Sequence, residues 1–181
     1  MIFVGIGANL PIESFGPPRA TCGAALGRLD RTGVRIVRCS PWYRTAPVPV
    51  SDQPWFVNAV AEVETELDPE ALLARLLDVE QAFGRRRAEP NAARTLDLDV
   101  IDYAGKVSRA GDPPPILPHP RLAQRAFVVL PLADLAPDWC HPATGVPIGD
   151  VMRDLPAGQK ADRMAPGGGP WGTEWDGKAS P

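Results

Sequence analysis

The chain has 181 residues, of which 44% are hydrophobic and 23% are charged, and its formal net charge is −3. This length suits one domain with a proper core and is too short for two ordinary domains. The acidic balance argues against a general nucleic-acid binder, which is normally basic. No apolar run approaches the ~20 residues that a membrane span needs. Any anionic ligand must therefore be held by a local cluster of arginines.

Cysteine and histidine are scarce, with three and two copies respectively. Cys22, Cys39 and Cys140 are odd in number and show no Cys-x-x-Cys spacing, so neither a disulfide framework nor a zinc knuckle is indicated. The N-terminus lacks the basic region and the cleavage site of a signal peptide. We expect reduced thiols in a cytoplasmic protein that binds no nucleic acid and no membrane.

The first half of the chain predicts strands around one helix. Residues 1–8 are apolar and β-prone, and a short helix follows that ends at Gly33. Residues 34–45 alternate loosely between apolar residues and arginines, as in a half-buried strand, and Pro41 places it near an edge or at a bulge. Another strand runs from 55 to 63. The proline-rich stretch between these two strands is predicted to be a binding loop.

The clearest helix covers residues 69–83. Asp68 can cap it, Pro69 suits its first position, and Gly84 suits the position just after its end. Its apolar residues recur on one face at helical spacing, which indicates packing against the core. They are Leu72, Leu73, Leu76, Val79 and Phe83.

A strand at 95–103, a Gly- and Pro-rich loop and a mostly helical stretch to about residue 136 complete the order of elements. This order favours an α+β sandwich of ferredoxin-like type, in which helices cover one face of a mainly antiparallel sheet. We expect a single domain over residues 1–164. Residues 165–181 begin near a run of three glycines and are predicted to be a disordered C-terminal tail.

Two aspartates on the last predicted strand are the first candidates for chemistry. Strand alternation sends Asp97 and Asp99 to one face, about 6.5–7 Å apart along the strand. Such a pair can hold one or two Mg²⁺ ions, which complete their shells with phosphate oxygens and water. A solvated acidic strand face is the alternative, and these two residues alone do not decide between the two.

Neighbouring arginines favour a phosphate site. Residues 85–87 are all arginine, Arg94 precedes the acidic strand, and the loop at 88–93 between them could close over a polyphosphate. His119 lies between two prolines after that strand and could donate to a phosphate, although a surface histidine without function is the alternative. The chain carries no P-loop, Rossmann or Gly-x-Ser-x-Gly motif.

Several segments match one family in both order and spacing. They are Gly7-Ala8-Asn9-Leu10, Trp42-Tyr43-Arg44-Thr45, Gln53-Pro54-Trp55-Phe56-Val57-Asn58-Ala59-Val60, Gly84-Arg85-Arg86-Arg87, Arg94-Thr95-Leu96-Asp97-Leu98-Asp99, Leu117-Pro118-His119-Pro120-Arg121-Leu122 and Arg125-Ala126-Phe127. Together they resemble 6-hydroxymethyl-7,8-dihydropterin pyrophosphokinase of folate biosynthesis. The resemblance covers roughly residues 3–142. It implies transfer of the β,γ-pyrophosphoryl group of ATP to the hydroxymethyl oxygen of a reduced pterin, with release of AMP.

The resemblance also implies roles for individual residues. Two Mg²⁺ ions would be held by Asp97 and Asp99 along the triphosphate of ATP. The expected catalytic residues are Arg85, Arg94, Asp97 and Asp99. The expected ATP-binding residues are Arg85, Arg87, Arg94, His119 and Arg125. The expected pterin-binding residues are Thr45, Val48, Phe56, Asn58 and Phe127, with the two phenylalanines stacked on the flat ring. Glu80 also matches a position near the substrates, and the chain is expected to act as a monomer.

Two alternatives stay open. A non-catalytic pterin- or nucleotide-binding module of the same fold would have lost a carboxylate or a phosphate-binding arginine, yet Asp97, Asp99, Arg85 and Arg94 are all present. An ordinary phosphotransferase acting on another small alcohol would yield ADP instead of AMP. The loop at 88–93 lacks the tryptophan and glycine that some members of the family carry there, so its closing motion is not inferred.

Overall fold

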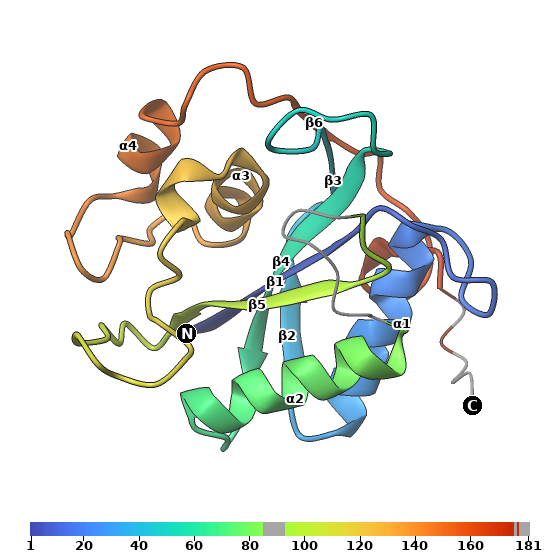
Figure 1. Cartoon of the computed structure of the whole chain (residues 1–181), viewed down its shortest axis with the longest axis horizontal. Coiled ribbons are helices and arrows are strands. Elements are labelled where there is room, and N and C mark those ends of the chain that lie inside the picture. Colours follow the sequence, from blue (N-terminus) through green and yellow to red (C-terminus); the bar gives the residue numbers. More distant parts are fainter. Residues whose placement is uncertain (85–92, 176, 178–181) are drawn as a thin grey trace.

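The structure, a computed structural model, describes residues 1–84, 93–175 and 177 (Figure 1). The strands are β1 (Ile2–Ala8), β2 (Arg35–Cys39), β3 (Tyr43–Thr45), β4 (Phe56–Glu64), β5 (Asp97–Tyr103) and β6 (Ala161–Arg163). The helices are α1 (Pro18–Arg31), α2 (Pro69–Ala82), α3 (Ala126–Leu135) and α4 (Ile148–Arg153), with 3-10 turns η1 (Leu122–Gln124) and η2 (Pro170–Gly172). None of the helices in this described part has the length and apolar character needed to cross a membrane.

All paired strands of the sheet run antiparallel, in the order β5-β1-β4-β3-β6, and β2 also pairs with β4. The predicted α+β class is confirmed. The predicted strand at 34–45 is two strands, β2 and β3, which pair with different halves of β4. The break lies at Pro41, as its missing N–H suggests, and Ser40 replaces the lost ladder contacts. Its backbone N–H donates to the Val60 carbonyl, and its Oγ accepts from the Val60 N–H.

Helices cover both faces of the sheet, so the expectation of one covered face is wrong (Figure 1). Helices α1 and α2 pack on the face that carries Val4, Leu98 and Val100. Helices α3 and α4 pack on the opposite face, over Phe3 and Ile101. The second face carries apolar side chains at the end of the sheet where β1 begins, and these need a cover. Toward the other end the same face carries polar residues and glycines, and there it opens into a pocket.

Residues 165–175, part of the segment that the sequence predicts to be a disordered tail, pack against the domain. Trp175 is buried, and its ring lies over Gly27 of α1, while Thr173 and the Trp175 Cβ lie against Gly23, so an added Cβ at either glycine would overlap these residues. The Trp171 and Trp175 rings stack with centroids 6.2 Å apart, and the Trp171 carbonyl accepts a hydrogen bond of 2.9 Å from the Trp42 indole. Small residues on α1 leave space that the tail fills, a complementarity that no local sequence pattern reveals.

Candidate active site

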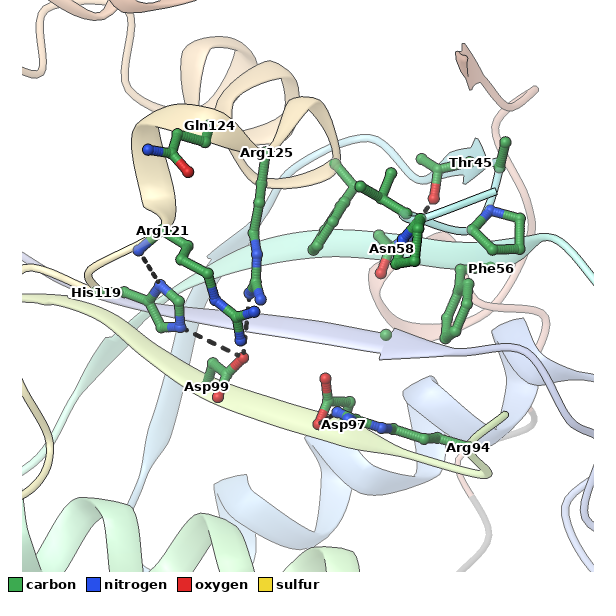
Figure 2. Close-up of a pocket in the computed structure, with 16 residues that line it drawn as sticks. Thr45, Phe56, Asn58, Arg94, Asp97, Asp99, His119, Arg121, Gln124 and Arg125 are labelled. Carbon is green, nitrogen blue, oxygen red and sulfur yellow. Dashed lines mark hydrogen bonds and ion pairs between the residues drawn. The ribbon is translucent and has the colours of Figure 1, made fainter. Parts of the chain in front are cut away.

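One cavity of about 480 Å³ opens over the polar end of the sheet, between β5, the β3–β4 connection and the segment before α3 (Figure 2). Its lining contains three arginines, two aspartates, one histidine and two phenylalanines. The lining residues are Gly7, Thr45, Ala46, Pro47, Val48, Pro49, Phe56, Asn58, Arg94, Asp97, Asp99, His119, Arg121, Gln124, Arg125 and Phe127.

Strand β5 presents both aspartates to this cavity. Leu98 and Val100 are buried in the core on the opposite side of the strand, so the predicted alternation is confirmed. The Asp97 and Asp99 side chains are 27% and 42% exposed, which leaves oxygens of both within reach of a ligand. Buried Glu80 on α2 fixes the strand, because its Oε1 accepts a hydrogen bond of 2.6 Å from the Leu98 N–H.

The start of β5 is tied to the loop before β4 by Asn9, a buried residue to which the sequence assigned no role. Its Oδ1 accepts from the Arg94 N–H at 2.7 Å, and its Nδ2 donates to the Pro54 carbonyl at 3.0 Å. The Asn9 N–H donates in turn to the Arg94 carbonyl at 3.0 Å. These bonds hold the backbone of Arg94 beside the segment that leads to Phe56.

Cationic side chains surround the two aspartates. Arg94 Nη1 lies 2.6 Å from Asp97 Oδ1, a charge-assisted hydrogen bond. Asp99 Oδ2 lies 4.0 Å from both His119 Nε2 and Arg125 Nη1. Figure 2 shows His119 and Arg125 reaching toward β5 from the segment before α3, while Arg94 lies beside Asp97 just before β5. Cations and carboxylates therefore partly neutralise each other within the cavity.

His119 is held as a neutral hydrogen-bond donor. Its Nδ1 accepts a hydrogen bond of 3.1 Å from the Arg121 N–H, so the ring proton of the neutral form sits on Nε2, which faces Asp99. Burial lowers the pKa of His119, and the charges of Arg125 and Arg121 lower it further against the opposing effect of Asp99. Burial also lowers the pKa of Arg125, but a guanidinium stays charged in proteins.

The other end of the cavity combines a polar edge with two aromatic rings. Buried Asn58 on β4 donates from Nδ2 to Thr45 Oγ1 at 2.7 Å. Phe56 and Phe127 are both half-buried in the lining. Gly7 on β1 pairs with Asn58 on one side and Asp97 on the other, and an added Cβ there would overlap Asn58 Oδ1. Asn58 and Asp97 are therefore two strand spacings apart, about 10 Å, and Gly7 places no side chain between them.

Apart from Glu80, which is buried behind β5, all the predicted site residues that the structure describes line this one cavity, and their individual roles stay predictions. Arg85 and Arg87 lie outside the described residues, as do residues 88–92 of the loop at 88–93. Sequence reasoning missed Gly7, Arg121 and Gln124 as lining residues. Arg121 could have been found, because it follows His119 by two residues within a segment already matched to the family. No local signal marks Gln124.

Comparisons with known proteins agree on one family. The family model for 7,8-dihydro-6-hydroxymethylpterin-pyrophosphokinase matches residues 3–137. A 2-amino-4-hydroxy-6-hydroxymethyldihydropteridine pyrophosphokinase of Methylorubrum extorquens is 39% identical over 75% of this chain and 82% of that protein. One of the same name from Pseudomonas aeruginosa is 40% identical over 76% of this chain and 81% of that protein.

Larger proteins contain a similar region. The folic acid synthesis protein fol1 of Pneumocystis carinii is 34% identical over 85% of this chain but only 20% of its own length. A crystal structure of Plasmodium falciparum HPPK-DHPS superposes with a TM-score of 0.61 at 12% identity, over 84% of this chain and 43% of that one, and supports the fold alone. The match of the family model over residues 3–137, together with the two bacterial relatives, shows that the chain belongs to the 7,8-dihydro-6-hydroxymethylpterin-pyrophosphokinase family.

Proposed function

We propose that this protein transfers the β,γ-diphosphoryl group of ATP to the hydroxymethyl oxygen of 6-hydroxymethyl-7,8-dihydropterin, in the synthesis of folate. The hydroxyl oxygen bonds to the β-phosphorus, the bond from that phosphorus to the α,β-bridging oxygen breaks, AMP leaves, and the hydroxyl proton is released. The observation that carries this proposal is the single cavity in which a carboxylate and arginine cluster adjoins a polar and aromatic recess. Each half suits one of the two substrates.

The recess beside β4 suits a pterin. A flat bicyclic ring would lie between Phe56 and Phe127, and each stacking contact is worth ~0.5–1.5 kcal/mol beyond area burial. Asn58 would present its amide to the polar edge of the ring, oriented by the hydrogen bond to Thr45. Thr45 and Val48 line the same recess, and their backbone groups would complete the recognition of that edge. In this orientation of the pterin ring, the hydroxymethyl group would point across Gly7 toward Asp97 and Asp99.

The cluster on β5 suits a metal-bound triphosphate. Mg²⁺ usually takes one or two carboxylates from a protein, and phosphate oxygens and water supply its other ligands. The carboxylates of Asp97 and Asp99 therefore fit two such ions. When bound, Mg²⁺ would neutralise phosphate charge and lower the pKa of the attacking hydroxyl. Arg94 and Arg125, whose guanidinium groups face the carboxylates in this structure, would then contact the phosphate oxygens.

His119 would donate a hydrogen bond to a phosphate oxygen and would not act as a general base. Neither ring nitrogen is free to accept a proton from the substrate, because Nδ1 accepts a hydrogen bond from the Arg121 N–H and Nε2 already carries the ring proton. The chain's contribution to the reaction is therefore alignment of the two substrates and electrostatic stabilisation of the phosphoryl group, with Arg94 and Arg85 stabilising the developing charge. Arg85 and Arg87 enter this proposal from the family resemblance alone.

The nucleotide product tests this proposal. The protein is mixed with Mg-ATP and the reduced pterin alcohol, and the nucleotides are separated by anion-exchange chromatography. AMP formed only when the pterin is present supports the proposal, while ADP would indicate an ordinary phosphotransferase. Binding of both substrates without turnover would identify the alternative, a non-catalytic module of the same fold.

We further propose that the chain acts as a monomer in the cytoplasm, without nucleic-acid or membrane partners. The acidic balance and the three free thiols support this proposal. Light scattering on a size-exclusion column would test it, because a mass of twice 19.4 kDa would indicate a dimer.

A further inference from the structure

Gln159 lies between α4 and β6, beyond the residues 3–137 that the family model matches. Its side-chain amide makes two hydrogen bonds to the backbone on either side of Arg125. Nε2 donates to the Gln124 carbonyl at 2.8 Å, and Oε1 accepts from the Ala126 N–H at 2.9 Å. A glutamine more than 30 residues away thus holds both peptide groups that flank a cationic residue of the cavity.

Arg125 occupies a position where the backbone needs such support. It is the N-cap of α3 with φ −120° and ψ 104°, and its own side chain makes no capping hydrogen bond. The Ala126 N–H is one of the first donors of the helix, which have no partner inside the helix itself. Gln159 therefore supplies the capping hydrogen bond that an N-cap side chain normally makes. The Arg125 guanidinium is then available to face Asp99 and the Phe127 ring, whose centroid lies 5.3 Å from Arg125 Cζ.

The same short segment also holds the opposite wall of the cavity. The carbonyl of Lys160 accepts a hydrogen bond of 3.0 Å from the Ala46 N–H, and Ala161 pairs with Thr45 in the β3–β6 ladder. Both Thr45 and Ala46 line the cavity. Residues 159–161 therefore connect the wall that carries Arg125 to the wall that carries Thr45, and they fix the distance between the two.

We propose that Gln159 is a positioning residue, which sets Arg125 for contact with the triphosphate and, through the same turn, sets Phe127 against the pterin. This inference rests on the proposed function of the cavity. It assigns a role in the reaction to the C-terminal segment, outside the matched region. A helix cap without a role in the site would lower stability and leave the kinetic constants of the folded protein unchanged.

A double-mutant cycle tests the proposal. Gln159→Met keeps the length of the side chain and removes both hydrogen bonds. Its kcat/KM for ATP, measured below the unfolding temperature, is expected to fall about tenfold, which corresponds to about 1.4 kcal/mol. In an Arg125→Ala background, at saturating pterin, the same substitution should have little further effect on kcat/KM for ATP, because the triphosphate contact that Gln159 positions is already lost. Lys160→Met is the matched control, since its contact with Ala46 uses only the backbone carbonyl.

The outcomes separate this inference from the proposed function. If wild-type protein forms AMP and Gln159→Met matches it in kcat/KM, the inference is wrong and the proposed function stands. Equal losses in the wild-type and Arg125→Ala backgrounds would also overturn it. If Gln159→Met does not fold, Gln159→Glu goes through the same cycle, because it keeps the acceptor for the Ala126 N–H and loses only the donor to Gln124. Absence of AMP from wild type would refute the proposed function itself.

Discussion

Substitution of Gly7 by alanine should weaken pterin binding in a protein that still folds. Gly7 lies in β1 with an ordinary extended backbone, so alanine meets no conformational penalty there and gains about 0.4–1 kcal/mol from the unfolded chain. The new Cβ would overlap Asn58 Oδ1. The Asn58 amide must then rotate, which breaks its 2.7 Å hydrogen bond to Thr45 and turns it away from the pterin edge.

The size of the effect follows from the group that is displaced. A buried polar group left without its partner costs about 1–3 kcal/mol. In this variant the polar edge of the bound pterin also loses its Asn58 partner, and a cost of that size corresponds to about 5- to 150-fold weaker pterin binding. Binding of Mg-ATP should stay near the wild-type value, because the overlap involves Asn58 and not Asp97.

Calorimetric titration of the reduced pterin alcohol into each variant measures this difference, and thermal unfolding confirms that the variants are folded. Gly5→Ala is the matched control on the same strand, because its Cβ would approach the Ile101 side chain, 3.1 Å from Cδ1 and 3.3 Å from Cγ1, and not Asn58. An unchanged pterin Kd in Gly7→Ala, or an equal loss in Gly5→Ala, would refute the assignment of the recess to the pterin.

Substitutions at four further positions test other parts of the account. Asp97→Ala should abolish turnover while circular dichroism shows an intact fold, and near-normal turnover would remove Asp97 from the proposed metal site. Phe127→Ala should weaken pterin binding by at least the ~0.5–1.5 kcal/mol of one stacking contact, whereas an unchanged Kd in calorimetry would exclude the sandwich. His119→Gln keeps a donor near the position of Nε2, so its kcat/KM should exceed that of His119→Ala; equal losses would instead indicate a base. Trp175→Ala should lower the free energy of unfolding in urea by about 3–5 kcal/mol with little change in kcat at low temperature, and an unchanged midpoint would show that the C-terminal packing contributes nothing.

Local patterns predicted the parts of the molecule that depend on neighbours in the chain. Period-2 alternation placed Asp97 and Asp99 opposite the buried Leu98, because β-strand geometry leaves no other arrangement. The cap residues at Asp68 and Pro69 located the start of α2, where the Asp68 side chain accepts from the Ala71 N–H at 2.8 Å.

Local patterns could not predict contacts between segments that are far apart in the chain. The packing of Trp175 on Gly27 depends on a small residue whose partner is more than 100 positions away. Asn9 and Gln159 support Arg94 and Arg125 through backbone hydrogen bonds, which leave no periodicity in the sequence. The second covered face of the sheet was missed because the apolar residues that require it, such as Phe3, are buried by α3, more than 100 positions later in the chain.

The most direct test of the central claim is the mass of the pterin product. After incubation of the protein with Mg-ATP and 6-hydroxymethyl-7,8-dihydropterin, mass spectrometry should find the pterin carrying two phosphoryl groups, in an amount equal to the AMP formed. A pterin that carries a single phosphoryl group, or one that is recovered unmodified after binding to the cavity, would contradict the account.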